Sequence, residues 1–262
     1  MSSYKGHLLF AFFISLIFFQ GPIFIALTVI GASLPDFDHD VKKSNVYKMI
    51  IIGLIMFIIL YITNQPYLIG LIFLTLPIIF YFSKHRGFTH SILGIFLLSL
   101  ILSLVIIMGI FLIYPFLNYL NISNNIYEYY LLSSIIMIVG LGILILNKNI
   151  IPIFLVLFLL GVLFLQKESY SIFNIYQISH FFIKPLFNSI IIIKNYFIYE
   201  VILYFFIPIF LGLFSHVILD SFSPAGVKVL NPFSSKKVHK KFSFISMFFI
   251  FSLACFNLIF II

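Results

Sequence analysis

Residues 8–40 read LLFAFFISLIFFQGPIFIALTVIGASLPDFDHD, an apolar run that ends in three aspartates and a histidine. Gln20-Gly21-Pro22 interrupts the run. Because proline suits the first turn of a helix and breaks an interior one, we expect two short helices that meet at a tight turn. Each half is shorter than a comfortable membrane span, so the hairpin of residues 7–34 should stop partway across the bilayer or pack against other helices.

The composition of the whole chain indicates an integral membrane protein. Hydrophobic residues make up 63% of the chain and charged residues 8%, and the mean hydropathy is +1.24, which excludes a water-soluble globule with a polar surface. Further apolar runs of spanning length lie near 46–62, 66–83, 91–117, 129–147, 150–166, 197–219 and 242–262. The sequence therefore predicts an all-α, polytopic helical bundle of about seven full spans plus the N-terminal hairpin, in a single domain over residues 1–262.

The distribution of basic residues predicts the orientation of this bundle. Threading the segments back and forth leaves only Lys167, Lys184 and Lys194 of the 15 basic residues on one side. The other twelve share the opposite side: Lys5, Lys42, Lys43, Lys48, Lys84, Arg86, Lys148, Lys228, Lys236, Lys237, Lys240 and Lys241. Because loops rich in Lys and Arg stay in the cytoplasm, this side is expected to be cytoplasmic, although a phosphate-binding site would gather cations in the same way.

The residues suited to chemistry gather on the same side. It holds all four aspartates and six of the histidines: Asp36, Asp38, Asp40, Asp220, His7, His39, His85, His90, His216 and His239. The glutamates lie on the other side or at its border. The single cysteine, Cys255, lies in an apolar stretch, which excludes a disulfide framework and a Cys-rich zinc site. One membrane face is expected to carry the function.

The predicted hairpin determines where His7 should lie relative to the aspartates. A chain that climbs about 13 helical residues, turns at Gly21-Pro22 and descends a similar number returns to its starting height, so His7 and Asp36 should end level. Taken alone, without the hairpin, His7 would be interpreted as an interfacial residue that reaches toward the headgroups.

The stretch SHVILDSFSP, residues 215–224, carries His216 and Asp220 one helical turn apart on one face, a spacing that suits metal ligands. The alternative is a His–Asp pair that caps the helix end. A carboxylate is unfavourable near a helix C-terminus, so Asp220 needs a compensating cation, which a metal would supply.

The stretch KHRGFTHSILG, residues 84–94, contributes His85 and His90. On one continuous helix the two would point apart, so Gly87 is expected in a loop, with Thr89 or Ser91 starting a helix and His90 in its first turn. Arg86, the only arginine, is the better candidate for a phosphate clamp because its planar fork binds two oxygens. The alternative for this cluster is a membrane-surface anchor.

The acidic stretch after the hairpin has the D-x-D-x-D spacing of an EF-hand loop but lacks the rest of it. Val41 replaces the required glycine and Tyr47 the bidentate glutamate. With histidines nearby, mixed nitrogen and oxygen ligands favour Zn²⁺, Mn²⁺ or Fe over Ca²⁺ or Mg²⁺. Asp36 would share a face with His39 on a helix, or with Asp38 on an extended strand.

The motifs LPDFDHD, HRGFTHS and SHVILDSFSPAGVKVLNPF, in this order after an early His7, resemble the YdjM-like family of membrane-bound, metal-dependent hydrolases. That family is distantly similar to zinc-dependent phospholipases C and single-strand nucleases, whose zinc ions are held by His and Asp. The resemblance implies His216 and Asp220 as ligands, with His7, Asp36, Asp38, His39 and His90 as companions. His85, from the stretch 84–94, is a further candidate ligand, and Zn²⁺ is the expected ion.

The chemistry expected from this arrangement is metal-assisted hydrolysis of a phosphoester. A bound ion would lower the pKa of water toward about 7 for in-line attack, Arg86 would hold phosphoryl oxygens, and Asp38 or Asp40, whichever is not a ligand, would protonate the leaving group. A site at the surface of the cytoplasmic membrane favours a lipid or lipid-linked phosphate as substrate, and no nucleic acid is implied. The alternatives are a non-catalytic metal-binding membrane protein and a transporter, which would place its ionisable groups nearer the midplane. Segment 167–196 is expected to lie along the opposite surface.

Overall fold

The computed structural model describes residues 4–19, 21–38, 43–63, 67–82, 86–120, 126–165 and 196–261 of the chain. Within these residues every regular element is helical apart from an isolated bridge between Val227 and Val238. The α-helices are α1 (Tyr4–Phe18), α2 (Pro22–Ser33), α3 (Lys43–Ile62), α4 (Leu68–Phe82), α5 (Ile92–Tyr119), α6 (Ile126–Ile145), α7 (Ile151–Leu165), α10 (Tyr196–Ser221) and α11 (Lys240–Ile261). Two short 3-10 helices, η1 (Pro35–Asp38) and η3 (Phe88–His90), precede α3 and α5. The all-α prediction is confirmed for the described residues.

Three of the described helices are long and apolar enough to cross a bilayer unaided: Ile92–Tyr119, Glu128–Ile145 and Ile202–Ser221. Shorter apolar helices cover Tyr4–Phe18, Pro22–Ser33, Met49–Ile62, Gly70–Tyr81 and Ile151–Phe164. A helical membrane protein is therefore the appropriate class. The finer expectation of about seven full spans stays a prediction, and segment 167–196 lies, apart from its last residue, outside the described part of the chain.

The N-terminal apolar run forms two helices, α1 and α2, on either side of Gly21. Pro22 occupies the first helical position of α2, where a missing backbone N–H costs nothing. The two helices pack against each other and against α10. Nearly all of α2 is buried, so the second half of the hairpin is a core element, as a helix too short to span the bilayer requires.

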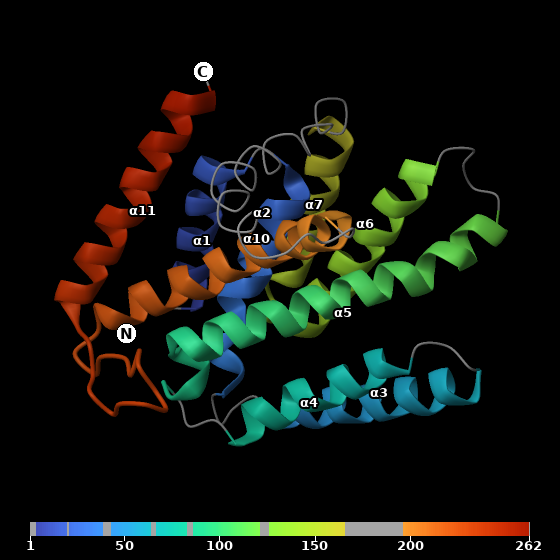
Figure 1. Cartoon of the computed structure of the whole chain (residues 1–262), viewed down its shortest axis with the longest axis horizontal. Helices are drawn as coiled ribbons and strands as arrows, with labels where there is room; N and C mark the ends of the chain where they lie inside the picture. Colours follow the sequence, from blue (N-terminus) through green and yellow to red (C-terminus); the bar gives the residue numbers. More distant parts are fainter. Residues whose placement is uncertain are drawn as a thin grey trace.

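Helix α10 lies at the centre of the bundle, between α2 and α5 (Figure 1). Glycines allow its close contact with α2. A Cβ added to Gly212 would lie 2.0 Å from the carbonyl oxygen of Thr28, and one added to Gly31 would lie 2.5 Å from that of Ile209. Small residues at helix contacts allow such approach in membrane proteins. The result is a fixed register between the two helices.

Several connections meet at one end of this bundle. The Tyr4 hydroxyl oxygen at the start of α1 accepts a hydrogen bond of 3.2 Å from the backbone N–H of Asn147, between α6 and α7. The backbone N–H of Ile92, at the start of α5, donates to the carbonyl oxygen of Val229 at 2.9 Å, after the end of α10. Segments that are distant in sequence thus share one end, and the polar residues of the candidate site lie there.

Candidate metal centre

His216, in the last turns of α10, has a ring orientation fixed by α2. Its Nδ1 lies 2.7 Å from the carbonyl oxygen of Ala32, and because a carbonyl can only accept, Nδ1 carries the proton and donates it. The side chain is completely buried, and its Nε2 has no hydrogen-bond partner among the described residues. In the neutral ring Nε2 therefore presents a bare lone pair, which is the form that binds metal ions.

Asp220 lies one turn after His216, and both of its carboxylate oxygens lie near nitrogen atoms of other side chains. Its Oδ1 lies 3.5 Å from His7 Nε2 and 3.2 Å from Arg86 Nη2. Its Oδ2 lies 3.3 Å from His90 Nε2 and 3.7 Å from His216 Nε2. Asp220 is only 4% exposed. A buried carboxylate with nitrogen atoms around both oxygens is the centre of the cluster.

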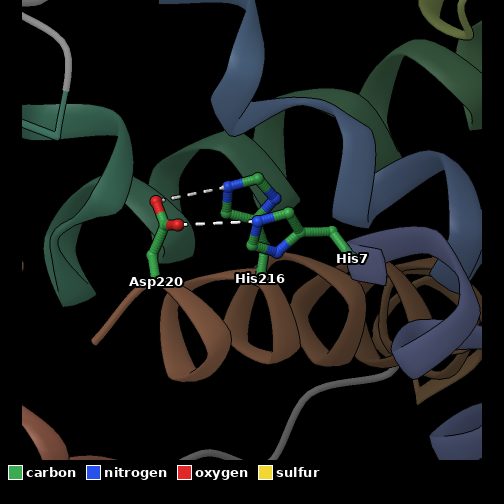
Figure 2. A group of neighbouring side chains, drawn as sticks. All are labelled: His7, His216 and Asp220. Carbon is green, nitrogen blue, oxygen red and sulfur yellow. Dashed lines mark ion pairs between the residues drawn. The ribbon is translucent and has the colours of Figure 1, made fainter. Parts of the chain in front are cut away.

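His7 reaches this cluster from α1, which begins more than two hundred residues earlier in the chain. Its ring stacks on that of His216, with centroids 3.8 Å apart and planes inclined by 12° (Figure 2). Asp36, which follows α2, also lies near His216, with its Oδ1 3.7 Å from His216 Nε2. The hairpin thus brings both His7 and Asp36 to His216.

His90 is the last residue of η3 and precedes α5. Ser91 is the N-cap of α5, its Oγ accepting a 3.0 Å hydrogen bond from the backbone N–H of Gly94, as Ser91 or Thr89 was expected to do. His90 is completely buried, and its Nδ1 lies 3.0 Å from Thr89 Oγ1. The expectation that His90 lies in the first turn of α5 was wrong. His90 ends the short helix η3 and precedes Ser91, the N-cap of α5.

Arg86 supplies the cation that the end of α10 requires. Its Nη1 donates to Ser223 Oγ at 2.8 Å and its Nη2 to Asp220 Oδ1 at 3.2 Å. Ser223 Oγ in turn donates to the backbone carbonyl of Asp220 at 2.7 Å. The backbone of Arg86 has φ +59°, a left-handed conformation that a non-glycine residue adopts at some cost. The need of Asp220 for a positive charge therefore does not by itself require a metal.

The spacing of the donor atoms nevertheless fits a metal ion. One ligand atom each from His7, His216 and Asp220 can be chosen so that all three lie within 4.8 Å of one another. Two donors about 2.1 Å from a tetrahedral ion lie about 3.4 Å apart. The His–carboxylate separations of 3.3 to 3.7 Å are near this length and longer than an ordinary N–H···O hydrogen bond of about 2.9 Å. This buried triad could hold a metal ion.

The charges of the described cluster also leave room for a cation. Two carboxylates, Asp36 and Asp220, face one guanidinium, that of Arg86, and three histidines. With the histidines neutral, one net negative charge remains in a largely buried space, which is costly unless a cation joins it. A divalent ion would change this balance to one net positive charge.

The remaining predicted site residues are less fully described. Asp38 is the last residue of η1, so the acidic stretch begins as a 3-10 helix rather than as an α-helix or a strand. His39, Asp40 and His85 lie outside the described residues. The side chain of Asp36 is 22% exposed, which makes it the most accessible member of the cluster. His239 is exposed, and it forms no ion pair within the described part of the chain.

Two partners of the cluster were not predicted. Ser223 lies in the quoted motif, where Ser223-Pro224 was interpreted only as a turn signal. The carbonyl of Ala32 is a backbone group, so its role cannot be predicted from residue type. The small residues of Gly31-Ala32-Ser33 are nevertheless typical of close helix packing.

The first part of the chain is similar to a known family of membrane proteins. Residues 1–109 match the YdjM inner membrane protein family. The YdjM match contains His7, Asp36, Arg86 and His90, whereas His216 and Asp220 lie beyond it. No curated protein and no solved structure matches the chain. The resemblance to the YdjM family is thus confirmed over residues 1–109, and the metal-ligand candidates come from both inside and outside that region.

Proposed function

We propose that this protein is a membrane-bound, metal-dependent hydrolase that cleaves a phosphoester. The observation that carries the proposal is the fixed orientation of His216. Its Nδ1 is committed to the Ala32 carbonyl, and its Nε2 faces carboxylate oxygens of Asp36 and Asp220 at 3.7 Å each. A bare lone pair that faces two carboxylates is repelled unless a proton or a metal ion lies between them.

Zn²⁺ is the ion that this donor set favours, because imidazole and carboxylate donors in tetrahedral spacing are typical of it. When bound, it would lower the pKa of a water molecule enough to provide hydroxide near neutral pH. His7, His216 and Asp220 would hold it, and His90 and Asp36 would complete or orient the ligand set. Before that water is deprotonated, the ligand cluster would carry one net positive charge, which attracts an anionic phosphoester.

Other residues of the chain would position the substrate. Asp36 and Arg86 form the accessible edge of the cluster, with side chains 22% and 13% exposed, so a substrate would approach past them. Arg86 would orient Asp220 and offer positive charge to a phosphoryl group. Asp38 or Asp40 would protonate the leaving group from the segment that follows Asp36.

The site would lie at the cytoplasmic surface of the membrane. His216 and Asp220 lie near the end of the apolar helix Ile202–Ser221. Twelve of the 15 basic residues would lie on the same side in the predicted topology of seven spans plus the N-terminal hairpin. A lipid or lipid-linked phosphate is the substrate that such a location favours. Cysteine labelling would test the orientation: residues near Asp36 and Lys236–Lys241 should react from the cytoplasm, and residues near Asn121–Glu128 from outside.

A non-catalytic metal site is the second candidate, and the burial of the cluster favours it. His7, His90, His216 and Asp220 are all at most 4% exposed, and closed sites with only protein ligands are typical of structural metals. A catalytic site requires an open coordination position. The two candidates differ in whether the Asp36 edge admits a substrate.

Purified protein in detergent would separate these candidates. Metal content by mass spectrometry and hydrolysis of phospholipid and soluble phosphoester substrates would be measured for the parent, His216→Ala and His239→Gln, with and without chelator. The hydrolase predicts turnover that chelation and His216→Ala abolish and His239→Gln preserves. Metal binding without turnover on any phosphoester would support the structural site, and absence of metal from the folded parent would contradict both.

A further inference from the structure

The connection between α10 and α11 is an ordered hairpin rather than a loose loop. Val227 and Val238 exchange two backbone hydrogen bonds, of 3.0 and 2.8 Å. Gly226, with φ +64°, adopts the left-handed conformation that precedes this pairing. Val227 and Val229 are buried in the main core, and the carbonyl of Val229 accepts the backbone N–H of Ile92 at 2.9 Å. The base of the hairpin is therefore fixed to the body of the protein.

The tip of this hairpin, residues 230–237, exposes apolar side chains. Phe233 is 84% exposed and Leu230 54% exposed. The turn itself is formed by local bonds, with the backbone N–H of Ser234 donating to the carbonyl of Leu230 at 3.0 Å. Unlike the exposed apolar residues along the helices, these two lie on a connection beyond the end of a spanning segment. Their exposure to water would be unfavourable.

Positive charge surrounds the apolar tip. Lys236, Lys237, Lys240 and Lys241 are all exposed, and no aspartate or glutamate occurs between Asp220 and the end of the chain. Lysines immediately next to a membrane helix bind anionic lipid headgroups, and apolar side chains on a basic element insert at the boundary between headgroups and acyl chains. Charge and polarity thus fit an anionic bilayer surface better than water.

We propose that the tip 230–237 docks on the surface of the bilayer in which the protein resides, with Leu230 and Phe233 inserted at the interface and the lysines on anionic phospholipid headgroups. The base of the same hairpin carries Ser223, which accepts a hydrogen bond from Arg86. Docking would therefore hold the membrane surface beside the His/Asp cluster. This inference does not depend on whether the cluster binds metal or is catalytic.

The absence of tryptophan from the chain gives a direct test. Phe233→Trp would carry the only tryptophan, and its fluorescence would be measured in vesicles of phosphatidylcholine with and without phosphatidylglycerol. We expect blue-shifted emission, strong quenching by brominated lipids and several-fold weaker quenching by acrylamide than for a free tryptophan amide. The effects should be larger in the vesicles that contain phosphatidylglycerol and should decrease when Lys236→Gln and Lys237→Gln are added.

Phe248→Trp is the matched reference, because Phe248 lies within α11 and is 73% exposed. It should be quenched by brominated lipids in both vesicle types, which shows that the protein is inserted and folded. If Phe233→Trp behaves like free tryptophan amide in both vesicle types while Phe248→Trp is quenched, the docking proposal fails, and the tip is left as a surface for a soluble partner. Equal insertion with and without phosphatidylglycerol would overturn the headgroup part of the proposal.

Discussion

Helices α10 and α6 are both long and apolar enough to span a bilayer, yet their polar and small residues have opposite surroundings. The carboxylate nearest the C-terminus of α10, that of Asp220, is buried in the last turn, where the helix dipole opposes it. That of α6, Glu128, is exposed in the first turn, where the dipole favours it. Glu128 therefore stabilises α6 locally. Asp220 is locally unfavourable in α10 and is stabilised by residues of other segments that surround it.

The glycines of the two helices differ in the same way. A Cβ at Gly212 of α10 would meet the backbone of α2. In α6, a Cβ at Gly140 would meet nothing within 4 Å, and one at Gly142 would meet the side-chain ring of Phe154. Gly212 lies one turn before His216, so the close contact that it allows is also what brings His216 to the Ala32 carbonyl. Packing and site geometry are therefore coupled at Gly212 of α10 and not at Gly140 of α6.

The largest effect is expected for Asp220→Asn in the metal-free protein. Removing this carboxylate leaves the largely buried guanidinium of Arg86 without its charge partner, and breaking a buried pair in this way costs about 3–5 kcal/mol. The double variant Arg86→Gln with Asp220→Asn should lose less stability than Asp220→Asn alone. Thermal unfolding in detergent with chelator would measure both, and a double variant that is less stable than Asp220→Asn alone would contradict the coupling of the pair.

Metal removal should give the next largest effect. If His216 and Asp220 are ligands, free metal at about 100 times its dissociation constant stabilises the fold by about 2.7 kcal/mol, so chelation should lower the melting temperature by roughly 5–10 °C. The double variant His216→Gln with Asp220→Asn should show almost no response to chelator, and His239→Gln should respond like the parent. Equal metal content in parent and double variant would rule out the site.

A smaller loss is expected for Gly212→Ala. The added Cβ collides with a backbone oxygen rather than a flexible side chain, and overpacking of this kind costs about 1–3 kcal/mol. Because the helices must separate, metal affinity should fall as well. Gly140→Ala is the matched control and should be neutral or stabilise α6 by up to about 1 kcal/mol. Similar melting temperatures for the two variants would contradict the difference between the helices.

The helices were largely predictable, because apolar runs and proline positions are local signals. The predicted segment 91–117 is α5 at Ile92–Tyr119, and 197–219 is α10 at Tyr196–Ser221. What could not be predicted is how far each helix reaches across a membrane. Helix α4, at Leu68–Phe82, is too short to be counted as an independent span, and its position depends on packing that no single segment encodes.

The candidate site was predictable in its residue types and less so in its contacts. His216 and Asp220 share a helical face, so their proximity follows from spacing alone. The role of Arg86 does not: a side chain interpreted as a phosphate clamp contacts Asp220, 134 residues further along the chain. That contact depends on the tertiary fold, in which α5 packs against α10. The same holds for the Ala32 carbonyl, which selects the tautomer of His216.

The smallest effect is expected for Glu128→Gln, which tests the contribution of the carboxylate in the first turn of α6. A carboxylate in the first turn of a helix contributes about 0.3–1 kcal/mol at low salt, and exposure places Glu128 toward the lower limit. Since salt screens exposed charges, the difference in melting temperature between parent and variant should shrink as ionic strength rises. Metal content and the response to chelator should not change, because Glu128 begins α6 and takes no part in the cluster around Asp220. A loss of bound metal in Glu128→Gln would mean that the two ends of the bundle are coupled, and the assignment of the chemistry to one end would then be wrong.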